Sequence, residues 1–205
     1  MSRYTGPRLK VLRALGVDLP GLSRKSMQER SQPPGQHGAR KVAARKSEFG
    51  LQLMEKQKLR YNYGLTERQL RRAVTDAKRH RGATGDKLVE LLERRLDNLV
   101  FRAGFAPTIP AARQLVSHGH FQLNGKRVTI PSIRLRVGDS FGPTEAGGKI
   151  DLVRFTLEAP SLERPEWIGF DGSTRTARLT HLPDGDAAPY PLDLQRVVEY
   201  YATRM

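Results

Sequence analysis

The chain has 205 residues, with 36 Lys and Arg against 21 Asp and Glu and no cysteine. This length allows one or two domains with a buried core, and the net charge of +15 points to a polyanionic partner. The lack of cysteine excludes disulfides and thiolate zinc sites. No window reaches the length of a membrane span, about 18 uncharged apolar residues, and the N-terminus lacks the apolar stretch of a signal peptide. We therefore expect a cytoplasmic protein with no membrane partner.

The excess positive charge lies in the N-terminal part of the chain. Residues 1–81 carry 20 Lys or Arg against 6 Asp or Glu, whereas residues 82–205 carry 16 against 15. A run rich in turn residues at 32–38 precedes a basic cluster at 40–46, and this composition favours irregular structure. We interpret residues 1–46 as a basic arm laid along a phosphate backbone. The alternative is a solvated tail without a partner, and the salt dependence of binding distinguishes the two.

Residues 47–85 predict two helices. Ser47 is placed to cap a helix that runs to about Tyr63, with Gly64 at its end. Thr66 and Gln69 have the spacing of a capping box, which opens a second helix. That helix has an apolar side, whereas its remaining positions are mostly basic; the apolar residues are Leu70, Ala73, Val74 and Ala77. Residues 81–85 read as a linker.

Residues 86–119 predict one long helix and one short helix. Asp86 is placed to cap a helix through Ala103 that ends at Gly104, with a leucine-rich apolar stripe along it. After Pro110, a short helix carries Ala112, Leu115 and Val116 on one side. The opposite side, which includes Arg113 and Ser117, is expected to point away from the core and to be available for binding.

The following residues predict an antiparallel sheet. Asn124-Gly125 lies between residues 121–123 and 126–130 and is the signature of a type I′ hairpin, because both positions accept positive φ. We expect this turn to place Lys126 and Arg127 beside the polar side of the short helix. Residues 134–141 and 150–157 read as further strands, and residues 174–182 can hold strands. Residues 193–201 have the spacing of a C-terminal helix.

At this point the sequence resembles the S-four family of small-subunit ribosomal proteins, of the bacterial type, over nearly its whole length. The motifs that carry the resemblance are Pro33-Pro34-Gly35-Gln36-His37-Gly38, residues 55–69, residues 91–100, and residues 112–120 leading into Asn124-Gly125. The last two form a small RNA-binding module that the family shares with pseudouridine synthases, a tyrosyl-tRNA synthetase extension and a heat-shock protein. The first two are much more specific to the ribosomal family.

The resemblance implies an α+β fold and a role in the ribosome. The fold would have a basic arm (1–46), a helical domain (47–85, completed by 190–205) and an RNA-binding module on a small, mostly antiparallel sheet (86–189). Similar proteins bind the small-subunit ribosomal RNA, nucleate assembly of the subunit body, contact small-subunit protein five and other neighbours, and influence translational accuracy. The four zinc-binding cysteines of some relatives are absent, which places the chain with the zinc-free branch.

Phosphate and ribose contacts of folded RNA are the chemistry we expect, from Lys, Arg and a few hydrogen-bonding side chains. In the arm these residues are Arg3, Arg40, Lys41, Arg45 and Lys46; in the helical domain they are Lys56, Lys58, Arg60, Arg68, Arg71 and Arg72; in the module they are Arg113, Gln114, Ser117, His118, Asn124, Lys126 and Arg127.

Enzyme chemistry has no matching motif in the sequence. The glycines at 142–150 lack the spacing of a phosphate-binding loop, no Gly-x-Ser-x-Gly elbow occurs, and the histidines lack further metal ligands nearby. We therefore expect no catalytic residue, metal, cofactor or small-molecule substrate. Two alternatives are an RNA-modifying enzyme built on the same module and an RNA-binding regulator that represses a messenger RNA.

Overall fold

The computed structural model describes residues 4–28, 31–36, 38 and 47–203. It divides into two compact units, one made of Met1–Leu88 and Ala188–Met205 and the other of Val89–Ala187. In the described residues helices predominate in the first unit, and the second unit combines helices with a five-stranded antiparallel sheet. The expected α+β fold is confirmed. No described helix is both long and apolar enough to cross a membrane.

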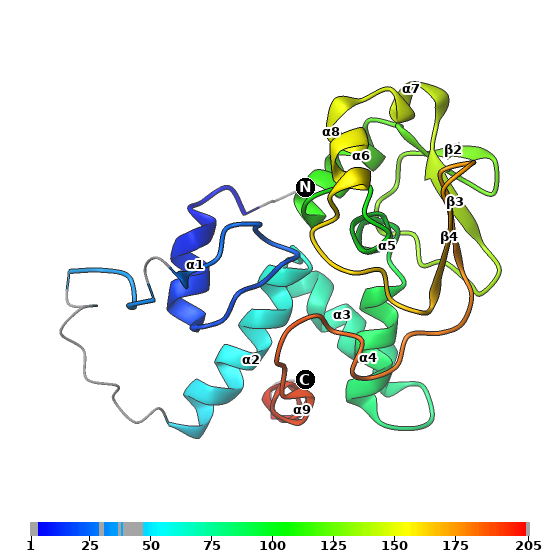
Figure 1. Ribbon diagram of the computed structural model, residues 1–205. Helices are drawn as coiled ribbons and strands as arrows, with labels where there is room; N and C mark the ends of the chain where they lie inside the picture. Colours follow the sequence, from blue (N-terminus) through cyan, green and yellow to red (C-terminus); the bar gives the residue numbers. More distant parts are fainter. Residues whose placement is uncertain (1–3, 29–30, 37, 39–46, 204–205) are drawn as a thin grey trace. The chain divides into compact units, whose positions relative to one another are not determined.

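The first unit is a set of helices that the C-terminal segment completes. Buried side chains of α9, such as Val197 and Tyr201, pack toward α2 and α3, and Figure 1 shows α9 beside α2. Gly85 lies so close to this helix that an added Cβ would come within 2.9 Å of the Leu194 Cβ. The helices are α1 (Arg8–Leu15), α2 (Glu48–Asn62), α3 (Glu67–Lys78), the start of α4 (Thr84–Glu93) and α9 (Leu194–Ala202).

The helix starts in this unit follow the local sequence. The Ser47 hydroxyl accepts the Gly50 N–H at 3.2 Å, and the Gln69 N–H donates to the Thr66 hydroxyl at 3.3 Å. The Gln69 side chain in turn accepts the Thr66 N–H at 3.0 Å, which completes the capping box. Both caps were expected from the residue types. The four apolar residues expected on one side of α3 are all buried.

Part of the segment expected to be an irregular arm is helical. In α1, Val11 and Leu12 are buried in a small apolar cluster. Gly16 ends the helix with a positive φ of 69°, a conformation that glycine adopts without strain. The high density of Lys, Arg and turn residues in the first 46 positions concealed this short apolar pattern. The cluster contains Val11, Leu12, Leu19, Leu22 and Tyr190.

The second unit packs helices against one face of the sheet. Phe105 lies between the helices and the strands, with its ring centroid 5.5 Å from that of Phe121 and 6.3 Å from that of Phe141. The strand order is β2-β1-β3-β5-β4. The elements are α5 (Leu96–Arg102), α6 (Ile109–Ser117), β1 (Phe121–Leu123), β2 (Lys126–Val128), β3 (Ser140–Pro143), α7 (Glu145–Gly148), α8 (Asp151–Glu158), β4 (Ile168–Asp171) and β5 (Thr176–Leu179).

The prediction of a single long helix from Asp86 to Ala103 is wrong, because the helical conformation is interrupted between α4 (Thr84–Glu93) and α5 (Leu96–Arg102). Arg95 has an extended conformation and forms a β-bridge with Arg134. The Leu96 N–H donates to the Ile133 carbonyl at 2.8 Å, so this backbone group bonds to a distant segment and not to its own helix. The leucine spacing continues across the break, and periodicity alone therefore gave no sign of it.

Two strands expected beyond the hairpin are also corrected. Residues 151–158 form helix α8, with Val153 and Thr156 buried at a three-residue step. Residues 134–141 contribute only their end to the sheet, where β3 begins at Ser140. Short apolar segments fit a helix and a strand almost equally well, and packing decides between them. The strand β5, in contrast, falls within the expected range 174–182.

Candidate nucleic-acid interface

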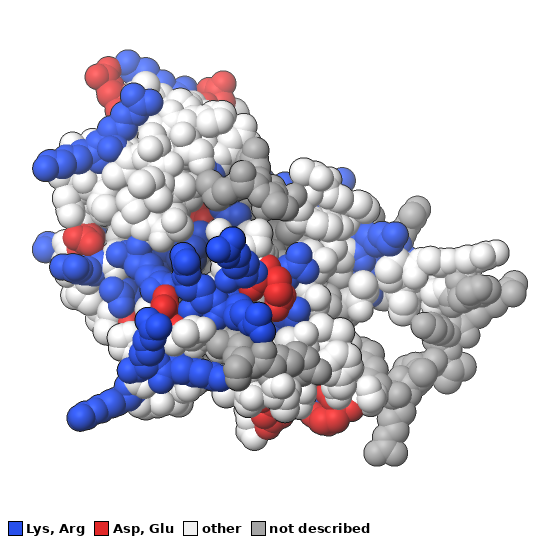
Figure 2. Space-filling model, turned by 180° about the vertical axis from the view of Figure 1, so that it is seen from behind, with Lys and Arg blue, Asp and Glu red and all other residues white. Residues whose placement is uncertain are grey.

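The exposed side of α3 carries a row of arginines. Because the apolar residues of this helix are buried, Arg68, Arg71 and Arg72 are exposed to solvent. Lys78 and Arg79 continue the row at the end of the helix. Figure 2 shows one face of the molecule on which Lys and Arg side chains are much more prominent than Asp and Glu. The exposed Lys and Arg side chains of α3 are of the type that neutralises phosphates.

The lysines Lys56 and Lys58 of α2 form ion pairs with carboxylates of the first unit. Lys56 is buried, with its Nζ 2.8 Å from the Glu67 Oε2 and 5.0 Å from the centre of the Tyr200 ring. Lys58 Nζ donates to the Glu55 Oε1 at 2.6 Å. The sequence placed these lysines among the RNA contacts, whereas the structure gives them intramolecular partners. Lys56 thereby joins α2 to α3, whereas the Lys58–Glu55 pair lies within α2.

Arg60 is likewise engaged within its own unit. Its Nη1 donates to the Gln57 Oε1 at 3.3 Å, and its guanidinium lies 5.2 Å from the centre of the Tyr61 ring. A cation above an aromatic face is attracted by the negative charge density of the ring. Like the two lysines, Arg60 was expected at the RNA surface and is half-buried in the structure.

A hydrogen-bonded carboxylate links α3 to the C-terminal helix. The Tyr201 hydroxyl donates to the Glu67 Oε1 at 2.7 Å, and Lys56 binds the other oxygen. Burial alone would raise the pKa of Glu67, but hydrogen bonds from Lys56 and Tyr201 outweigh it and lower the pKa below the ordinary 4.5. Burial, together with the Glu67 hydrogen bond, raises the pKa of Tyr201, which keeps the phenol protonated as a donor.

Helix α6 presents a polar side because its apolar side is buried. The helix begins after Thr108, whose hydroxyl accepts the Ala111 N–H at 3.4 Å. Gln114, Ser117 and His118 are exposed, as expected from the 3.6-residue period. The Ser117 hydroxyl donates to the Arg113 carbonyl at 2.7 Å, so its oxygen remains an acceptor toward solvent.

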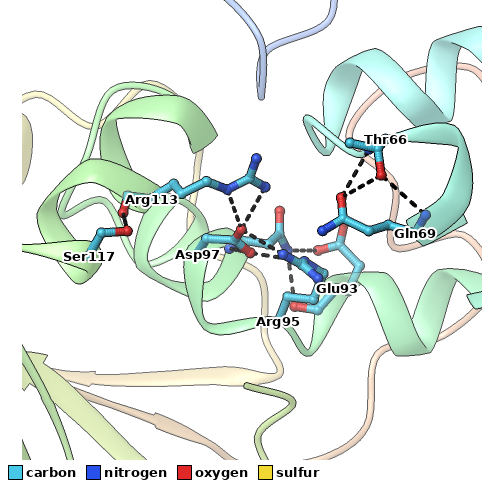
Figure 3. A network of polar contacts seen from close by, with 8 residues as sticks. Thr66, Gln69, Glu93, Arg95, Asp97, Arg113 and Ser117 are labelled. Carbon is cyan, nitrogen blue, oxygen red and sulfur yellow. Dashed lines mark hydrogen bonds and ion pairs between the residues drawn. The ribbon is translucent and has the colours of Figure 1, made fainter. Parts of the chain in front are cut away.

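Arg113 does not point away from the core as expected. Its Nε and Nη2 donate to the Asp97 Oδ2 at 3.0 and 2.7 Å. Asp97 has no exposed side-chain surface, and a buried carboxylate requires such partners because water cannot solvate it. Arg95 supplies two more hydrogen bonds to the same carboxylate, at 3.1 and 2.9 Å. Figure 3 shows both arginines directed toward Asp97, and it also draws the hydrogen bonds of the Thr66–Gln69 capping box.

Sequence reasoning missed Asp97 as the centre of this group. The signal was an acidic residue next to the buried leucines of 96 and 99, where an uncompensated charge is costly. Asn98 and Glu93 form a second buried polar pair, in which the Asn98 Nδ2 donates to the Glu93 Oε2 at 2.9 Å. Together these contacts fix the polar side of α6 relative to the start of α5.

The β1–β2 hairpin has the geometry that its sequence indicates. Asn124 and Gly125 have φ values of 48° and 76°, as a type I′ turn requires. The Asn124 side chain donates to the Asp139 Oδ1 at 2.9 Å and accepts the Ser140 N–H at 2.9 Å, which ties the turn to β3. Asn124 was expected to contact RNA, and the structure shows it holding the hairpin.

Arg127 lies beside the end of α6. Its Nε donates to the Gly119 carbonyl at 3.0 Å and its Nη2 to the His118 carbonyl at 3.3 Å. A cation at this position also interacts favourably with the helix dipole. The expectation that Arg127 would lie next to the short helix is confirmed, and Lys126 is exposed on the same strand.

The arm residues Arg3, Arg40, Lys41, Arg45 and Lys46 lie outside the described residues. Among the residues that are described, no three His, Asp or Glu side chains are grouped as metal ligands.

Two family descriptions match consecutive parts of the chain. Residues 3–93 match "Ribosomal protein S4/S9 N-terminal domain", and residues 94–141 match "S4 domain".

Full-length relatives have the same extent as this chain. It is 59% identical to "Small ribosomal subunit protein uS4" of Methylobacillus flagellatus and 60% identical to "Small ribosomal subunit protein uS4B" of Nitrosomonas europaea, in each case over the whole of both proteins. It is 89% identical to "Ribosomal protein uS4-like" of Azoarcus sp. over 108 residues, which are 53% of this chain and 94% of that protein. The resemblance that the sequence motifs carry is therefore confirmed. The chain belongs to the uS4 family of small ribosomal subunit proteins.

Proposed function

We propose that the chain is a structural constituent of the small ribosomal subunit that binds ribosomal RNA. The observation that carries the proposal is the identity of 59–60% to small-subunit proteins over the full length of the chain. The net charge of +15 and the arginine row on α3 are the chemistry such a role needs, because RNA is held largely through its phosphates.

The proposed RNA surface differs between the two units. In the first unit it comprises Arg68, Arg71 and Arg72. In the second unit it comprises Gln114, Ser117, His118, Lys126 and Arg127, which together can read phosphates and ribose hydroxyls. Arg113, which pairs with Asp97, remains an expected RNA contact, and the arm residues add charge. Lys56, Lys58 and Arg60 have partners within the first unit, and the exposed Asn124 holds the hairpin that carries Lys126 and Arg127.

The finer role follows from the family. We infer that the chain binds the RNA early, nucleates assembly of the subunit body, meets small-subunit protein five, and influences translational accuracy, in the cytoplasm on the ribosome. Catalysis is not part of the proposed function, because the chain matches small ribosomal subunit proteins over its whole length. Repression of a messenger RNA would use the same surface.

Co-sedimentation tests the proposal directly. A tagged chain produced in cells should sediment with small subunits and stay bound after washing in elevated salt. Filter binding should show tighter association with refolded small-subunit RNA than with an unrelated transcript of equal length. A chain that remains at the top of the gradient, or that binds both transcripts equally, would contradict a ribosomal role. Preferential binding to its own messenger RNA would favour the regulator.

A further inference from the structure

One segment of this basic protein is acidic. Residues 144–187 carry 5 Lys or Arg against 8 Asp or Glu, a net charge of −3, whereas the whole chain carries +15. The segment includes α7, α8, β4 and β5. A surface with excess carboxylates repels phosphates, and it attracts a positively charged partner.

Helix α8 has an apolar side that is exposed within this segment. The helix buries only Val153 and Thr156. Leu152 and Phe155, one turn apart on another side, are 42% and 68% exposed. Phe155 is the most exposed large apolar side chain among the described residues. Exposed aromatic side chains of this kind are typical of protein interfaces, where they act as anchors.

An open pocket of about 230 Å³ adjoins the helix, with room for one large apolar side chain. Its apolar lining comes from Leu157 and Phe170, and its charged lining from Glu158, Arg154 and Arg175. The two arginines already have contacts within the unit. Arg175 donates to the Gly148 carbonyl at 3.3 Å, and Arg154 lies 3.9 Å from the Asp151 carboxylate.

We propose that α8 and this pocket form a docking site for a basic segment of another small-subunit protein. In this arrangement the partner packs an apolar side chain against Phe155 and into the pocket, and its Lys or Arg side chains face Glu158. The proposal rests on the proposed function, because it is in the assembled subunit that such a partner is met. The charge of the segment favours a protein over RNA as the occupant.

Site-specific photo-cross-linking in the assembled subunit tests the site. A photoreactive benzophenone amino acid replaces Phe155 in the tagged full-length chain, and purified small subunits are irradiated. The expected result is a cross-link to one protein of the subunit, at a peptide with Lys or Arg next to an apolar residue. The same amino acid at Ile130, which is 58% exposed near the basic hairpin, is the matched control and should cross-link to RNA.

A charge reversal adds an independent measurement. Glu158→Lys should lower the cross-link from position 155 at least about tenfold, the size of effect expected at a central interface residue. Glu163→Lys, an exposed carboxylate outside the pocket, should leave the yield unchanged. A cross-link from position 155 to RNA or within the chain, or the lack of one, would overturn this inference alone. Absence of the tagged chain from small subunits would overturn the proposed function as well.

Discussion

Single residues in this protein have roles that charge and spacing alone do not assign. Arg113 and Arg127 both belong to the expected binding surface, yet Arg113 compensates a buried carboxylate and Arg127 binds carbonyls at a helix end. An arginine has five N–H donors in a planar group, so one side chain can bind several acceptors within the protein. Contacts within the protein therefore hold both side chains in place.

The Asp97 carboxylate predicts a stability cost for Arg113 that an exposed residue would not have. Arg113→Ala should lower the free energy of unfolding by about 1–3 kcal/mol, because buried Asp97 loses two hydrogen bonds. Arg95 remains as a partner and limits the loss. Gln114→Ala, one position along the same helix and exposed, should change it by less than about 0.5 kcal/mol. Urea unfolding measures both, and equal effects would show that the ion pair contributes nothing.

Glu67 predicts a loss of stability in acid. Its pKa is lowered in the folded protein, so its contribution is fully present above the ordinary value of 4.5 and is lost as the pH falls through the lower folded value. The melting temperature of the parent should exceed that of Glu67→Gln at pH 7, and the difference should shrink below about pH 4. Thermal unfolding from pH 7 to pH 3 measures this. A difference that does not depend on pH would contradict a role for the charged carboxylate.

Secondary-structure elements follow their local signals where a cap or a turn sets the backbone. The α3 capping box and the β1–β2 turn agree with the sequence because Thr66, Asn124 and Gly125 act within a few residues of themselves. The division between α4 and α5 does not follow such a signal. It depends on hydrogen bonds from Leu96 to Ile133 and from Leu135 to Arg94, about 40 residues away along the chain.

Two substitutions of Asn124 in the hairpin distinguish the contribution of its side-chain hydrogen bonds from that of backbone strain. Asn124→Gly keeps the positive φ accessible but loses the bonds to Asp139 and Ser140. Asn124→Ala loses the same bonds and adds the strain of a left-handed conformation, so it should be the less stable variant by about 1 kcal/mol. Urea unfolding of the two variants measures this difference. If Ala is as stable as Gly, the turn has changed its conformation.

The molecule as a whole concentrates its positive charge outside the acidic segment 144–187. If about eight basic side chains meet phosphates, the logarithm of RNA affinity should fall against the logarithm of salt concentration with a slope of about −6 to −7. Replacing both Arg68 and Arg72 by Ala should make the slope less negative by about 1–2. Glu163→Lys, which changes a charge in the acidic segment, is the control and should leave the slope unchanged. Filter binding at several salt concentrations measures the slopes, and a slope near zero would refute phosphate-dominated binding.

The sequence by itself determined the family, the α+β class, the helix caps, the hairpin and the apolar sides of α3 and α6. These depend on residue type and on short spacings, which act locally in any context. Only the tertiary structure decided which basic residues are exposed, since Lys56 pairs with Glu67 and Arg113 with Asp97 across different helices. Tertiary packing also decided that residues 151–158 form a helix and not a strand. The physical reason is that an ion pair or a packing choice depends on which distant segments meet, and periodicity along one segment does not contain that information.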